Sequence, residues 1–160
     1  MSELLIKPLV QAVLVADHVY QDTQTGKFVV CGILGRVHCD RSTVNDATES
    51  GSGSVQGRRA VIIPKGGLKW GSPFLYWSVT EVHRTQLFTI RYVQLATDRV
   101  MFELPVNLSA NDPMQVVQSV IPLPELPMIG GHYALEVIWN NEILGAHRIE
   151  IVDTIVEPER

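Results

Sequence analysis

The fold of this chain is decided by residues 130–152, which read GGHYALEVIWNNEILGAHRIEIV. Apolar residues recur at every second position on both sides of Asn140 and Asn141, and this is the period of a β-strand, not of a helix. Asparagine tolerates the left-handed backbone of tight hairpins. A two-residue loop would pair odd positions with even ones, whereas a three-residue loop pairs odd with odd and gives one apolar face. We therefore expect a hairpin with a bulged three-residue loop and Asn141 left-handed.

Similar short runs fill the rest of the chain. Strands are predicted over residues 9–20, 28–38, 59–63, 74–83, 86–95, 100–104 and 115–121, with 9–38 forming a hairpin and Pro105 ending a strand before a polar connection over 107–113. Strands spaced by turn signals indicate an all-β fold, an antiparallel β-sandwich of about nine strands; a closed β-barrel is the alternative. The proline-rich stretch 122–127 and the following Tyr133 resemble the corner before the penultimate strand of immunoglobulin-like domains.

The length of 160 residues fits a single domain over 1–160. Residues 40–57 contain almost nothing to bury, and their Gly-Ser-Gly-Ser content is typical of a flexible spacer, so we expect a mobile loop there. Residues 153–160 are expected to form a loose tail.

Charge and composition argue against several kinds of partner. A net charge of −4 with scattered Lys and Arg gives no basic stripe for a nucleic acid. No apolar run reaches the length of a membrane span, and the N-terminus lacks the pattern of a secretory signal. Cys31 and Cys39 would lie about 26 Å apart on one extended strand, too far for a disulfide. We therefore expect free thiols, a cytoplasmic location, and no nucleic-acid or membrane partner.

Metal binding and catalysis find little support in the pattern. His38, Cys39 and Asp40 are the densest group of possible zinc ligands, but neighbours on a strand point to opposite faces, and no Cys-x-x-Cys or His-Glu-x-x-His spacing is present. No serine lies in a Gly-x-Ser-x-Gly elbow. Glu136 and Glu150 are expected on a solvated polar face. We therefore predict no cofactor and no enzyme activity, with a metal-dependent enzyme at residues 38–40 as the weakest alternative.

Aromatic residues give the strongest sign of binding. Trp70 lies in a glycine-rich segment, and Tyr76 and Trp77 are adjacent on a strand, so their rings leave opposite faces. An exposed aromatic pair could bind a small ligand or carbohydrate, or another protein; alternatively, Trp77 fills the core. Our first hypothesis is a non-catalytic interaction domain that acts by protein association, including association with itself through a sheet face or edge. A small-ligand or carbohydrate-binding module using Trp70, Tyr76 and Trp77 is the second.

Several short motifs resemble a bacterial family of uncharacterised proteins, the domain of unknown function number 6941. They include residues 13–20, 25–28, 92–100 and 141–145, with the pairs Asp112-Pro113 and Gly131-His132. The likeness covers most of the chain except residues 40–70, which look like an insertion. The resemblance implies a bacterial cytoplasmic protein with an immunoglobulin-like fold, and it implies no activity, cofactor or site residue.

Overall fold

The computed structural model describes residues 6–40, 73–124, 126 and 129–154, and all regular structure in them is β-strand. The predicted strand over 59–63, nearly all of the predicted loop 40–57, and most of the predicted tail lie outside these residues. The strands run in the order β1 (Leu9–Gln21), β2 (Phe28–Ile33), β3 (Arg36–Asp40), β4 (Phe74–Thr80), β5 (Arg84–Gln94), β6 (Arg99–Ala110), β7 (Val117–Pro122), β8 (Gly131–Trp139) and β9 (Glu142–Thr154).

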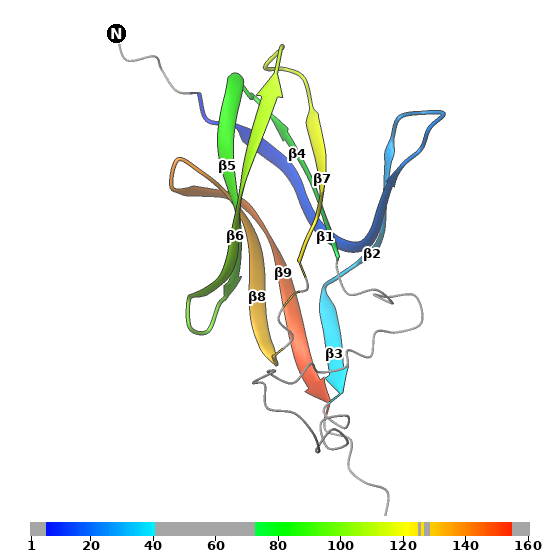
Figure 1. The fold of residues 1–160 in the computed structure, drawn as a ribbon, viewed down its shortest axis with the longest axis vertical. Helices are drawn as coiled ribbons and strands as arrows, with labels where there is room; N and C mark the ends of the chain where they lie inside the picture. Colours follow the sequence, from blue (N-terminus) through cyan, green and yellow to red (C-terminus); the bar gives the residue numbers. More distant parts are fainter. Residues whose placement is uncertain (1–5, 41–72, 125, 127–128, 155–160) are drawn as a thin grey trace, which may run out of the picture.

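The strands form two sheets that pack as a β-sandwich, which confirms the predicted fold. One sheet has the order β2-β1-β4-β7 and the other β3-β9-β8-β5-β6, and in the described part of the chain they do not join into a closed barrel. In Figure 1, β5, β6 and β8 lie on the left and β4, β7 and β2 on the right. No described segment is a helix with the length and hydrophobicity needed to span a membrane.

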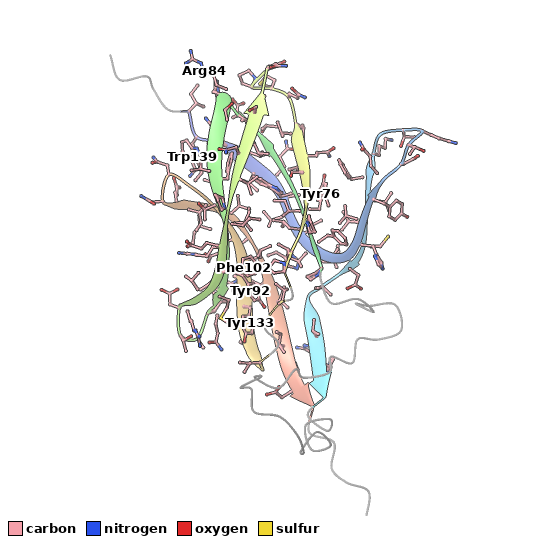
Figure 2. The ribbon with its side chains drawn as sticks, in the orientation of Figure 1. Tyr76, Arg84, Tyr92, Phe102, Tyr133 and Trp139 are labelled. Carbon is pink, nitrogen blue, oxygen red and sulfur yellow. The ribbon has the colours of Figure 1, made fainter. Side chains whose placement is uncertain are left out.

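The core lies between the sheets and is built on aromatic rings. Tyr92 stacks on Tyr133 with ring centroids 5.2 Å apart and on Phe102 at 5.6 Å, so three neighbouring strands of the five-stranded sheet share one stack (Figure 2). The Tyr133 hydroxyl donates a 2.9 Å hydrogen bond to the backbone oxygen of Ile129. A tyrosine at the start of a strand whose hydroxyl bonds back to the backbone a few residues upstream has the geometry of the tyrosine corner described for immunoglobulin-like sandwiches.

The turn of the last hairpin differs from the prediction. Trp139 pairs with Glu142, and both Asn140 and Asn141 have positive φ, so the loop has two residues, as a type I′ turn requires. The odd-with-odd pairing of the rest of the hairpin is confirmed, because a bulge just after the turn shifts the register between Val137 and Ile138. The two-residue turn alone would pair odd positions with even ones, and the bulge restores the pairing of odd with odd. As a consequence, Ile143 lies on the outer face of the sheet.

The predicted strand over 28–38 is two strands in two sheets. β2 pairs with β1 as expected, but after Leu34 and Gly35 the chain enters β3, which lies parallel to β9 in the other sheet. Leu34 is buried and Gly35 is exposed, so the crossing is anchored by one apolar side chain. The alternation of apolar and polar residues is the same in β2 and β3. The sequence pattern therefore did not show that the chain changes sheets between them.

β6 is longer than predicted. It continues through Pro105 to Ala110, and residues 107–110 are strand instead of a polar connection. A proline cannot donate to a ladder, but β6 is the edge of its sheet and needs hydrogen-bonded pairing on one side only. Similarly, β9 extends through Asp153 and Thr154, where the tail was expected to begin.

The β1–β2 hairpin folds over the outer face of its own sheet. β1 bends strongly in Figure 1, and the ring of Phe28 on β2 lies 5.7 Å from the ring of Tyr76 on β4, centroid to centroid. Gly32 has a φ of 69°, and a Cβ there would lie 2.5 Å from the carboxylate of the buried Asp17. A glycine is therefore required where the hairpin bends.

Candidate functional site

The outer face of the five-stranded sheet is the candidate site, and its composition follows from the register. On β8 the odd residues, including Tyr133 and Leu135, point into the core, so the even ones point outward. The cross-strand pairs extend this face over the sheet: Glu136 is opposite Arg91, and Arg91 is opposite Glu103. We call this surface, made by the outward residues of β9, β8, β5 and β6, the outer face.

One half of the outer face is charged. Arg91 donates two hydrogen bonds to the same oxygen of Glu136, from Nε at 2.9 Å and from Nη2 at 2.7 Å. Glu136 is only 8% exposed, so the prediction that it lies on a solvated face is wrong: it is a nearly buried carboxylate held by a cation. Ala134 and Val93, also on this half, are buried beside it.

The other half of the outer face is apolar. Leu87 is 56% exposed and Ile143 is 49% exposed. Between them, Ile138 is paired with both Ile143 and Thr89, and Thr89 is paired with Pro105 on β6. These residues are therefore neighbours on one surface. We call the set the apolar half: Leu87, Thr89, Pro105, Ile138 and Ile143.

Two charges on the outer face have no ion-pair partner among the residues that the structure describes. Arg148 on β9 is opposite the small Ala134, and Glu103 on β6 is opposite Arg91, whose side chain donates its hydrogen bonds to Glu136. Both are exposed. By contrast, Arg36 and Glu150 at the β3 edge are paired at 2.7 Å.

The sequence-predicted aromatic site is not assembled as such. Trp77 is 0% exposed and packs edge-on against Phe88 with centroids 5.2 Å apart, so its indole belongs to the core, as the alternative interpretation held. Tyr76 is half-buried on the opposite face of β4, where its hydroxyl accepts a 2.8 Å hydrogen bond from the Gln118 amide. Trp70 lies outside the described residues.

The weak metal alternative gains no support from what is described. His38 is exposed on β3, while the side chains of Cys39 and Asp40 are outside the description. Within residues 6–40, 73–124, 126 and 129–154, no three His, Cys, Asp or Glu side chains gather as a metal site would require. Cys31 is a free thiol on β2, where its charge raises the pKa of the neighbouring Tyr20.

Sequence reasoning missed the outer face as a site because it treated that side of the last hairpin as solvated. Ile138 was the available signal: it is an apolar residue at a position of the same parity as Glu136. Which residues of β5 and β6 continue the surface could not be predicted, because strand order is not encoded in local periodicity.

In comparisons with known proteins, no family model matches this chain and no curated protein matches it. The resemblance to the bacterial family named above therefore stays a prediction.

Proposed function

We propose that this β-sandwich is a non-catalytic interaction domain that binds another protein through the outer face of its five-stranded sheet. The observation that carries the proposal is the apolar half of that face. Leu87 and Ile143 expose 56% and 49% of their surface, and the register joins them through Thr89 and Ile138. Exposed apolar surface that is contiguous and bordered by polar residues is typical of a protein-binding site.

The shape and chemistry of the face favour a protein over a small ligand. Small-molecule sites are concave and enclose most of the ligand, whereas this face is the exterior of a sheet. Its apolar half borders a row of charges centred on Arg91 and Glu136. An apolar surface that borders polar and charged residues is common in protein interfaces.

Site-specific photo-crosslinking in the cells that make the protein tests this proposal. A benzophenone amino acid replaces Leu87 in the apolar half and, as the control, the exposed Tyr20 on the β1–β2 hairpin. We expect a protein adduct from position 87 and none from position 20. If irradiation at position 87 yields no protein adduct, the proposal is wrong.

A second candidate function rests on Tyr76. Its half-buried ring lies beside Phe28, and the Gln118 amide is at its hydroxyl, so an aromatic surface and a polar group are adjacent, as in carbohydrate sites. Calorimetric titration with a panel of oligosaccharides tests this function. Binding that is lost in Tyr76→Ala and kept in Tyr20→Ala would support it, and the absence of heat with every sugar would exclude it.

A further inference from the structure

We infer that the protein bound by the outer face is a second copy of this chain, related to the first by a two-fold axis that runs parallel to the strands between β8 and β5. This inference rests on the proposed function and specifies its partner. Face-to-face packing requires an axis in the plane of the interface, and an axis along the strands keeps the two sheets nearly aligned, as sandwich packing prefers. Under this operation β9 lies over the partner's β6, and β8 lies over the partner's β5.

The axis brings like regions of the face together where they are apolar. Because it preserves position along the strands, the apolar half of one copy meets the apolar half of the other. Leu87 on β5 comes over the β8 of the other copy beside the partner subunit's Ile138, and Ile143 on β9 comes over β6 near the partner subunit's Pro105. Leu87 and Ile143, the most exposed large apolar side chains on the described part of this face, are thereby buried.

The same axis brings opposite charges together on the other half. Glu136 and Arg91 are directly opposite each other on β8 and β5, so the axis places the Arg91 side of one ion pair over the Glu136 side of the other. Glu136 is nearly buried within each copy, so this contact is made mainly by the more exposed Arg91. Each copy contributes its one Arg91–Glu136 ion pair, and the two pairs together place four charges around the axis. Arg91 and Glu136 stay paired in this contact, so it does not bury either charge without a partner. Burial of an unpaired charge would weaken the association.

The two unpartnered charges of the face gain partners in this arrangement. Within one copy, Arg148 and Glu103 are three strand spacings apart, about 14 Å, which is too far for a direct ion pair. In the dimer, β9 lies over the partner's β6, so Arg148 comes within one residue pair of the partner subunit's Glu103. The two-fold symmetry makes this contact twice.

The charge balance of the face favours a second copy over an unlike partner. Among the outward strand residues whose side chains the structure describes, three are cations, Arg36, Arg91 and Arg148, and three are anions, Glu103, Glu136 and Glu150, so these charges balance (3 − 3 = 0). The chain as a whole carries −4, so two copies repel each other elsewhere. A face on which the described charges balance and alternate in sign is complementary to itself. It is not complementary to the surface of a strongly acidic or strongly basic partner.

Sedimentation equilibrium of the full chain and a charge-reversal cycle test the inference. We expect the native chain to form a dimer. Arg148→Glu and Glu103→Arg should each weaken the dimer about tenfold, because each turns two attractions into two repulsions. The double variant should return the dissociation constant to within about threefold of the native value. Both residues are exposed and unpartnered within the described part of the copy, so circular dichroism should show all three variants folded.

A second variant tests the apolar half independently. Ile143→Lys should abolish the dimer, whereas Ile33→Lys, at an equally exposed residue of β2, should leave it intact. A native chain that stays monomeric at high concentration, a dimer that survives Ile143→Lys, or a double reversal that fails to restore association would overturn the inference. The mass of the position-87 photo-adduct distinguishes failure of this inference from failure of the proposed function. An adduct of twice the chain mass supports self-association. An adduct of a different mass rejects self-association and keeps the proposed function, and the absence of an adduct rejects both.

Discussion

The outer faces of the two sheets differ in how their apolar side chains are covered. On the four-stranded sheet, Leu14, Phe74 and Val120 are half-buried around Tyr76, and the β1–β2 hairpin brings Phe28 against this face. On the five-stranded sheet, no described strand lies over the apolar half, and Leu87 and Ile143 stay exposed.

The difference shows that one chain can cover its two apolar surfaces in different ways. A bent hairpin closes one face from within, and the register of charges on the other face suits closure by an identical surface. The cover on the first face depends on backbone geometry at Gly32, whereas the second face depends on a part-buried ion pair and on the bulge that follows the last hairpin turn. Each dependence can be broken separately.

The largest effect is expected from Gly32→Ala. An alanine would have to hold a φ of 69° and place its Cβ 2.5 Å from the Asp17 carboxylate, which is buried and cannot move aside freely. We expect the free energy of unfolding to fall by about 3 kcal/mol, since left-handed strain and the steric clash add. Urea denaturation measures the change.

Gly35→Ala is the matched control, because Gly35 has no atom within 4 Å of the position of a Cβ and no positive φ. It should leave stability within about 0.5 kcal/mol of the native value. Equal losses in the two variants would contradict the role given to the hairpin bend.

Glu136→Ala should come next. It removes the carboxylate that pairs with Arg91 at a nearly buried position, and we expect the free energy of unfolding to fall by about 2 kcal/mol. Glu150→Ala removes an exposed ion pair with Arg36 on the same face and should cost less than about 1 kcal/mol. Denaturation is measured at low protein concentration, so that association does not contribute to the measured stability. A larger loss of stability in Glu150→Ala would show that burial does not decide which of the two ion pairs contributes more.

Tyr133→Phe should have a smaller effect. It deletes the hydroxyl that bonds Ile129 and keeps the ring that stacks on Tyr92, so we expect a loss of about 1 kcal/mol. Tyr20→Phe, at an exposed ring, is the control. Thermal unfolding measures the stability of both variants. Unchanged stability in Tyr133→Phe would show that the hydrogen bond to Ile129 does not stabilise the fold.

The sequence predicted strand positions well wherever alternation was local, as in the runs now assigned to β4, β5 and β8. It placed Tyr133 in a strand next to a stretch that resembles the corner of immunoglobulin-like domains, but it did not predict the hydrogen bond to Ile129. It could not predict that residues 36–40 leave one sheet for the other, since β3 pairs with β9 more than a hundred residues away. The turn at Asn140 and Asn141 was assigned the wrong length because a bulge two residues later produces the same pairing of odd positions.

The smallest effect concerns the tip of the β1–β2 hairpin. The Asp22 carboxylate accepts hydrogen bonds from the Thr25 hydroxyl and the Gln24 backbone, and these lower the pKa of Asp22. Because the folded pKa is depressed, the contribution to stability is present above the unfolded pKa and is lost as the pH falls through the folded one. Asp22→Asn should therefore flatten the acid side of the stability curve slightly, and NMR titration of the carboxylate should show a pKa below that of an unstructured Asp.

Isotope-filtered NMR on an equal mixture of labelled and unlabelled chains tests the central claim most directly. If the outer face of the five-stranded sheet closes on itself, the methyl groups of Leu87 should show intermolecular contacts with those of the partner subunit's Ile138. Intermolecular contacts at Ile33 on β2 with none at Leu87, Ile138 or Ile143 would contradict it.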